Sequence, residues 1–255
     1  MRLKAIIAAA MLLCACTARS PLGYWDGYDF SSQKGLQPIE EAQKRFGEWM
    51  KLLEKTDTAT AATCIREFLD AAKADTVSYY VYSDFFMAAL YPLDSPYRNV
   101  NLLRVYLRKA IADSIALDYL RFDEEAVLRK SYLNLKGSIA EDGGLQIVAD
   151  GSEATVLGLA GEADRTLLLL VGQAGCRSCL EEMRVTEART PRKTQLLAVV
   201  EKNPRGEADW LRGQLDGSRW TVAVAQESFR DGYDYGLAPV SYMLDRKGKI
   251  KSIIK

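Results

Sequence analysis

The sequence contains no histidine, and this absence removes the commonest general base and metal ligand from any mechanism proposed for it. Cysteine is scarce as well: the 255 residues include five, too few for a framework held together by disulfide bonds. Net charge is also absent, because 34 basic residues are matched by 34 acidic ones. The sequence therefore gives no reason to expect a nucleic-acid partner, which a basic surface would attract.

Cys176 and Cys179 form a Cys-x-x-Cys pair directly after an unbroken apolar run, residues 166–171, and a short turn. The run predicts a strand buried on both faces, and the apolar spacing after the pair predicts a helix. Cys176 is therefore expected at a helix N-terminus, where free N–H groups and the helix dipole lower a thiol's pKa. Cys179 follows one helical turn later. This arrangement suits one thiol that attacks a disulfide and a second that resolves the mixed disulfide.

Other interpretations of the pair stay open. A structural disulfide closing so short a loop would restrict the unfolded chain little. A structural zinc ion needs four ligands, and this chain offers no histidine and three further cysteines, two of them close to the N-terminus. A third alternative is an idle pair on a binding scaffold. We expect a redox-active pair with no metal and no cofactor.

The N-terminus has the pattern of an export signal. Two basic residues precede an apolar stretch, residues 5–13, which is too short to span a bilayer. It ends in Leu13-Cys14-Ala15-Cys16, which resembles the bacterial lipobox, where the cysteine after a small residue is acylated and becomes the new N-terminus. The resemblance implies a lipoprotein signal peptide over residues 1–16, lipidation of Cys16 and anchoring to a membrane of the cell envelope, facing the periplasm. An ordinary cleaved signal peptide is the alternative.

The remainder is predicted to be an α+β two-domain chain. Residues 17–37 read as a tether whose aromatic residues dock on the next domain, 38–135 as an all-α domain and 136–255 as an α/β domain. Apolar stripes at helical spacing predict five helices, joined by short loops into an antiparallel bundle. Pro38 is expected to begin the first helix, and Ser95 to cap the fourth with Pro96 in its first position.

The α/β part is predicted from short apolar runs and turn residues. A helix should begin at Pro204, capped by Asn203. The final two strands should form a hairpin around residues 246–249. The seven strands are expected at 145–149, 155–159, 166–171, 195–200, 220–225, 240–244 and 250–254.

The Cys pair, the strand before it and the stretch from Tyr235 to Val240 together resemble a thioredoxin fold of the membrane-tethered, extracytoplasmic TlpA/ResA type. The resemblance implies that Cys176 attacks and Cys179 resolves. It also implies that Pro239 is the family's cis-proline beside the pair and that, with Ala238, it shapes a groove for a substrate peptide. A plain loop proline is the alternative.

Three features depart from the family pattern. Ala174-Gly175 stand before the first cysteine, where a tryptophan or a proline-containing turn is usual. The family often carries an acidic residue under the resolving cysteine; Glu201 is nearby in the sequence, but the sequence does not place it there. The chain stops at Lys255, so that the usual final helix is missing and one face of the sheet is expected to lack cover.

The front half resembles a helical module of unknown function that precedes thioredoxin domains in lipoproteins of Gram-negative bacteria, through residues 24–30 and 90–99. The expected function is thus a lipid-anchored thiol-disulfide oxidoreductase that acts on protein or peptide thiols and disulfides and exchanges electrons with a redox partner protein. The alternative is a non-catalytic binding or assembly lipoprotein, and peroxide reduction is a weaker third option.

Overall fold

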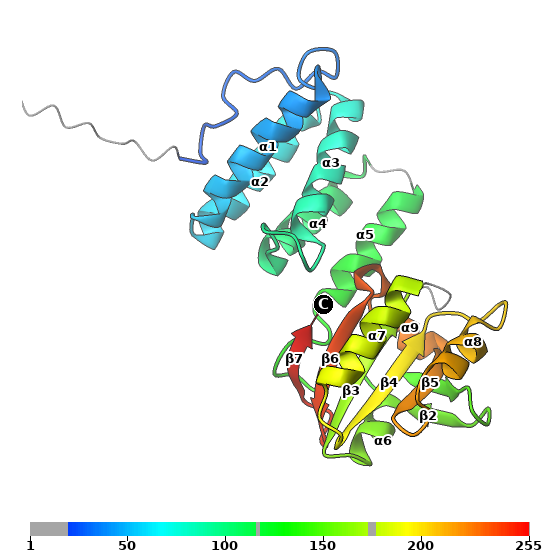
Figure 1. Ribbon diagram of the computed structural model, residues 1–255. Helices are drawn as coiled ribbons and strands as arrows, with labels where there is room; N and C mark the ends of the chain where they lie inside the picture. Colours follow the sequence, from blue (N-terminus) through cyan, green and yellow to red (C-terminus); the bar gives the residue numbers. More distant parts are fainter. Residues whose placement is uncertain (1–19, 116–117, 173–176, 255) are drawn as a thin grey trace, which may run out of the picture. The chain divides into compact units, whose positions relative to one another are not determined.

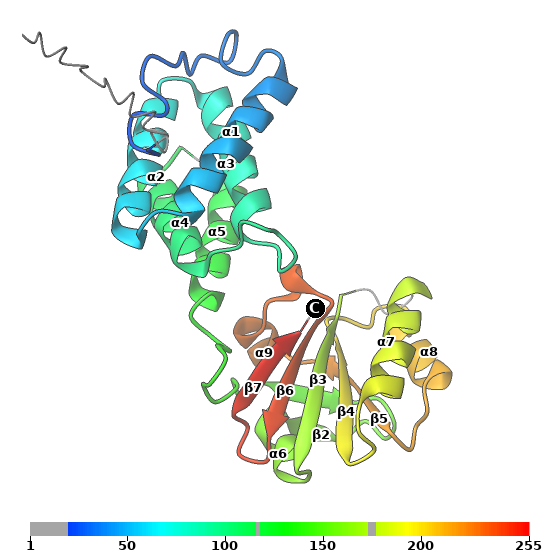
Figure 2. The ribbon, with the colours of Figure 1, turned by 60° about the vertical axis from the view of Figure 1, so that its left-hand side comes forward.

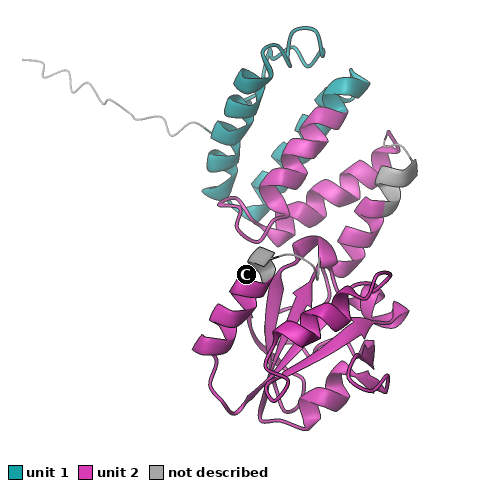
Figure 3. Ribbon diagram, turned by 45° about the vertical axis from the view of Figure 1, so that its right-hand side comes forward, with its two compact units in different colours: residues 1–79 teal, residues 80–255 magenta. Residues whose placement is uncertain are grey.

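The computed structural model describes residues 20–115, 118–172 and 177–254 (Figure 1). The chain divides into two compact units, one ending at Tyr79 and the other beginning at Tyr80 (Figure 3). The division falls inside a helix, α3 (Thr76–Leu90).

The first unit consists of two helices and an aromatic segment packed on them. The helices are α1 (Ile39–Glu54) and α2 (Thr58–Ala72). Trp49 stacks on Phe68 with ring centroids 5.0 Å apart, and Trp25 meets the edge of the Phe68 ring at 4.9 Å. The prediction that the aromatic residues after the leader dock on the helices is therefore confirmed.

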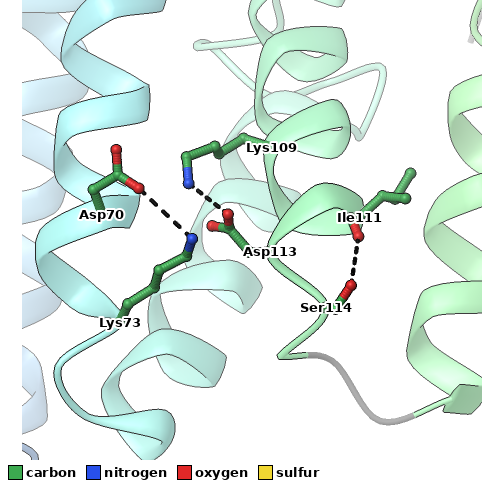
Figure 4. Close-up of polar contacts among 6 residues, drawn as sticks. All are labelled: Asp70, Lys73, Lys109, Ile111, Asp113 and Ser114. Atoms are coloured by element: carbon green, nitrogen blue, oxygen red, sulfur yellow. Dashed lines mark hydrogen bonds and ion pairs between the residues drawn. The ribbon is translucent and has the colours of Figure 1, made fainter.

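The second unit continues with the rest of α3, α4 (Val100–Asp113) and α5 (Asp118–Lys130). Polar contacts hold the C-terminal end of α4 (Figure 4). The Lys109 ammonium lies 2.5 Å from the Asp113 carboxylate, whose side chain is 4% exposed. Ser114 ends the helix in the left-handed conformation, with φ 53°.

A mixed sheet forms the centre of the second unit, with strands in the order β2-β1-β5-β4-β3-β6-β7 (Figures 1 and 2). β3 runs parallel to β4 and antiparallel to β6. The strands are β1 (Gly144–Ile147), β2 (Glu153–Thr155), β3 (Arg165–Val171), β4 (Thr194–Val200), β5 (Trp220–Ala225), β6 (Val240–Asp245) and β7 (Ile250–Ile254).

Each face of this sheet has its own apolar core, and β3 contributes to both. Leu168 and Leu170 point into the core shared with α6 (Val156–Gly161) and α9 (Glu227–Gly232). The alternate β3 residues, Leu167, Leu169 and Val171, point into the core shared with α7 (Arg177–Arg189) and α8 (Glu207–Gln214). Since residues 166–171 are all buried, the prediction of a strand covered on both faces is confirmed.

Two predicted helix starts are wrong. α4 is capped by Asn99, whose side chain accepts from the backbone N–H of Asn101 and Leu102, whereas the Ser95 hydroxyl donates back to Ala89 at the end of α3. α8 begins three residues after Pro204, at Glu207. The residue directly before α8 is Gly206, although the Asn203 side chain still accepts a hydrogen bond of 2.9 Å from the Ala208 N–H in the first turn.

The predicted strand over 155–159 is also wrong. β2 ends at Thr155, and the Thr155 hydroxyl accepts a hydrogen bond of 3.1 Å from the backbone N–H of Gly158. This bond caps α6, so an apolar stretch of strand-like composition becomes a short helix.

Asn134 ties the end of the helical region to the α/β region within the second unit. It is 6% exposed and has a positive φ of 50°. Its amide nitrogen donates to the Gly232 carbonyl oxygen at 2.9 Å, and its amide oxygen accepts from the Glu141 N–H at 2.8 Å. One buried side chain thus satisfies backbone groups of two distant segments.

Replacing Asn134 with alanine should lower the free energy of unfolding by about 2–4 kcal/mol, because two buried hydrogen bonds are lost and alanine tolerates the left-handed region poorly. Ser114→Ala is the matched control, since it shares the positive φ at an exposed position. Urea unfolding should show a clearly smaller loss for Ser114→Ala. Equal losses would mean that the buried hydrogen bonds contribute little.

Candidate functional site

The two cysteines lie where β3 passes into α7. Cys176 falls in segment 173–176, which lies outside the described residues. Cys179 is the third residue of α7, and the structure describes its backbone alone. The helix is held on the sheet by Leu180 and Met183, which are 5% and 1% exposed. The strand-to-helix junction expected from the sequence is thus present, and the positions of the two sulfurs stay a prediction.

Ala238 and Pro239 lie at the same end of the sheet. The Ala238–Pro239 peptide bond is cis, and Pro239 immediately precedes β6. Leu170 of β3 is opposite Val240 of β6 in the register. As a result, a Cβ atom on Gly172 would lie 3.4 Å from the Cβ of Ala238. The Ala238–Pro239 peptide therefore lies beside Gly172, the last described residue before segment 173–176.

A short 3-10 turn, Tyr235–Leu237, leads into this peptide. One oxygen of the Asp234 carboxylate accepts from the Gly236 N–H at 3.1 Å, and the Ala238 N–H donates to the Tyr235 carbonyl oxygen at 3.0 Å. The Tyr235 hydroxyl donates to the Val199 carbonyl oxygen near the end of β4, at 3.2 Å. Burial, and then the charge of Glu201, raise the pKa of Tyr235, so the hydroxyl stays protonated and remains a donor.

Glu201 follows the last residue of β4, and Val200 is opposite Val171 in the parallel register. The carboxylate is half-buried and belongs to the same end of the sheet as Gly172. The sequence suggested Glu201 from its position in the chain, and the register now explains why it emerges beside the junction.

A groove of about 630 Å³ extends from the end of the sheet where Gly172, Ala238 and Pro239 lie and follows the α7 face of the sheet. We refer to it as the α7–β6 groove. Glu182 and Arg189 bring charge to its α7 side. Ala238, Pro239 and Gly172 lie at the end where β6 begins. The groove is otherwise mainly apolar, and its floor and walls include Leu167, Leu169 and Val171 of β3, Met183 and Val185 of α7, Met243 of β6 and Ile254 of β7.

The other cysteines of the chain are Cys14, Cys16 and Cys64. Cys64 is 3% exposed in α2, and burial followed by the charge of Glu67 raises the pKa of its thiol. The prediction of a buried core thiol is confirmed, and a neutral buried thiol is a poor nucleophile. Cys16, the predicted lipidation site, lies outside the described residues.

The described residues form neither a cluster of metal ligands nor a membrane-spanning helix. Within residues 20–115, 118–172 and 177–254, no group of three or more Asp, Glu or Cys side chains is arranged to bind a metal ion. In the same part of the chain, every helix is too short or too polar to cross a membrane.

The sequence did not identify Asp234 or Gly172 as parts of this region, and it gave no role to the Tyr235 side chain. Asp234 carries a detectable signal, because an Asp two residues before a glycine and five before a proline is typical of a capped turn. Gly172 and Ala238 are 66 positions apart in the chain, and only the strand register brings them together.

No protein-family model matches the chain, and no curated protein matches it either. Among solved structures it is similar to a thioredoxin-like protein from Bacteroides caccae, with 18% identity, a TM-score of 0.67 and coverage of 99% of this chain and 94% of that one. The thioredoxin domain of a thiol-disulfide oxidoreductase from Bacteroides vulgatus matches 48% of this chain and 89% of its own, with 17% identity and a TM-score of 0.38. An exposed lipoprotein thioredoxin from Streptococcus pneumoniae matches 44% and 87%, with 22% identity and a TM-score of 0.33.

The likeness to the Bacteroides caccae protein covers the helical region and the sheet region together. The fold class predicted from the sequence is therefore confirmed: the chain has a thioredoxin-like fold preceded by a helical N-terminal region.

Proposed function

We propose that the protein is a thiol-disulfide oxidoreductase that exchanges disulfides with protein or peptide thiols through Cys176 and Cys179. The observation that carries the proposal is the close approach of the Ala238–Pro239 peptide to Gly172, the residue that follows the end of β3 at Val171. From Gly172 the chain goes on to α7, which begins at Arg177. A helix N-terminus favours a thiolate, and a backbone segment next to it can orient a bound peptide.

In the proposed reaction, the Cys176 thiolate attacks one sulfur of a substrate disulfide. A bond forms between Cys176 and that sulfur, the substrate disulfide breaks, and the departing substrate thiolate takes a proton from water. The Cys179 thiolate then attacks Cys176, forming the intramolecular disulfide and releasing the second substrate thiol. Two electrons pass to the substrate, and a redox partner protein must return them. The reverse sequence oxidises a substrate dithiol.

Cys176→Ser should reduce the rate of insulin disulfide reduction to that of the enzyme-free reaction, because it removes the proposed attacking thiol and the free thiol of Cys64 is buried. Cys179→Ser should still attack and should therefore accumulate mixed disulfides that run as adducts on non-reducing gels. Cys64→Ala is the control and should keep the activity. A Cys176→Ser protein as active as the parent would instead support the non-catalytic binding scaffold.

The groove suggests the form of the substrate. Because the α7–β6 groove continues from Ala238 and Pro239 and is mainly apolar, we propose that it takes an extended segment of the substrate polypeptide with apolar side chains next to the cysteine. Ile254 lies opposite Ser241, two residues after Pro239, and is 49% exposed. It can therefore contact a bound chain close to the site of exchange.

Ile254→Asp should raise KM for a peptide disulfide with apolar flanking residues by about tenfold, because a charge replaces roughly one aliphatic contact. Reduction of a small disulfide such as oxidised glutathione should be unchanged. Ile139→Asp is the matched control, since Ile139 is 51% exposed and does not line the groove. If both variants raise KM equally, the groove is not the binding site.

We further propose that Cys16 is acylated and anchors the protein to an envelope membrane, on the support of the leader sequence. Cys16→Ser should move the protein from the membrane fraction to the soluble extract of the envelope and abolish labelling with a fatty-acid analogue. Cys14→Ser should do neither. Equal release of both variants would contradict the assignment of Cys16, and release of the parent itself would favour an ordinary cleaved signal.

A further inference from the structure

The loop after α3 reaches the turn that leads into Ala238–Pro239. Tyr91 follows the last residue of α3, and its hydroxyl donates a hydrogen bond of 2.8 Å to the Asp234 carboxylate. The oxygen that accepts it also accepts from the Gly236 N–H at 3.1 Å. Both residues belong to the unit that begins at Tyr80. One carboxylate oxygen thus joins the helical region to the 3-10 turn.

The fit between the loop and the turn depends on Gly236. A Cβ atom at this position would overlap the Tyr91 hydroxyl oxygen. Tyr91 is itself held at both backbone ends, since its N–H donates to the Met87 carbonyl oxygen at 3.0 Å and its carbonyl oxygen accepts from the Arg98 guanidinium. The backbone contacts therefore fix the position of the Tyr91 hydroxyl next to Asp234, and Gly236 has no side chain that would block the contact.

Charged groups of both signs lie around this contact. Tyr91, Arg98, Asp234 and Tyr242 line a small cavity of about 70 Å³. Burial, and then Asp234, raise the pKa of Tyr91, so its hydroxyl stays a donor. Burial lowers the pKa of Arg98, while the neighbouring Tyr91, Tyr242 and Asp234 favour its charged form. A hydrogen bond to a partly buried carboxylate is among the stronger kinds in proteins.

We propose that Tyr91 is a positioning residue for substrate binding: through Asp234 it fixes the turn whose last hydrogen bond sets the backbone of Ala238. The inference rests on the proposed function. The path is short, because the Leu237 N–H donates to the Asp234 carbonyl oxygen at 3.2 Å and the Ala238 N–H to the Tyr235 carbonyl oxygen at 3.0 Å. The role assigned to the helical region is thus to hold the Ala238–Pro239 peptide in the position in which it binds the substrate.

Tyr91→Phe removes the hydroxyl and keeps the ring. It should raise KM for a peptide disulfide about tenfold, the size expected for a lost hydrogen bond to a charged group. The rate constant kcat, the reduction potential of the cysteine pair and the reduction of oxidised glutathione should stay unchanged. Deuterium exchange of the Gly236 and Ala238 amides should become faster.

Tyr80→Phe is the matched control, because Tyr80 lies on α3, the helix that Tyr91 follows, and its hydroxyl donates to the Ile115 carbonyl oxygen at 2.7 Å. It should change KM less than twofold and leave both amides protected. Asp234→Asn keeps an oxygen that accepts from Tyr91 and Gly236 and should stay near the parent, whereas Asp234→Ala should resemble Tyr91→Phe.

Unchanged KM and exchange in Tyr91→Phe would overturn the inference. So would an equal loss of activity toward the peptide and oxidised glutathione, which indicates general damage to the fold. A parent protein inert toward both disulfides would overturn the proposed function and the substrate role of Tyr91 with it. A parent that is active through Cys176, with a silent Tyr91→Phe variant, would overturn the inference alone.

Discussion

The burial of β3 on both faces is the constraint on which the arrangement of the site depends. Because the side chains of β3 fill two cores, the backbone must stay extended up to Val171. Gly172 is the first exposed residue after the strand, and the chain can change direction there. β4 and β6 flank β3, and their registers deliver Glu201 and Pro239 to the same end. The candidate site is therefore a consequence of strand register at the carboxyl end of a central strand, where open α/β sheets place their ligand sites.

The two faces of the sheet are covered differently, and the groove follows from this difference. On one face, α6 and α9 close over a core that reaches from Leu145 on β1 to Ile250 on β7. On the other, the described helices α7 and α8 supply Leu180, Met183 and Leu211, while Met243 on β6 is only partly buried at the margin of the core. An apolar sheet surface of this kind can bind a polypeptide without any dedicated side chain, because apolar contact is non-directional.

The sequence predicts strands here better than helix starts, for a physical reason. A run such as residues 166–171 has few ways to satisfy its backbone except in a central strand, and the structure confirms it. A polar side chain can accept from the first turn of a helix at several distances along the chain, so it does not fix the helix start: Asn203 accepts from the Ala208 N–H, but α8 begins at Glu207, directly after Gly206. The Cys-x-x-Cys pair and the apolar run before it predicted the strand-to-helix junction, because all of these residues are neighbours in the sequence. The contact of Gly172 with Ala238, and that of Tyr91 with Asp234, depend on register and on packing between distant segments.

The segment before Pro239 is held mainly by side chains from elsewhere in the unit. Tyr91 binds Asp234, Asn134 binds the Gly232 carbonyl, and Tyr235 reaches back to Val199. A chain cut between residues 135 and 136 would leave the Gly232 carbonyl and the Glu141 N–H without these partners, and water would have to replace them. The helical region is then part of what shapes the Ala238–Pro239 peptide. Selection for substrate binding would act on Tyr91 and Asn134 as well as on the residues that line the groove.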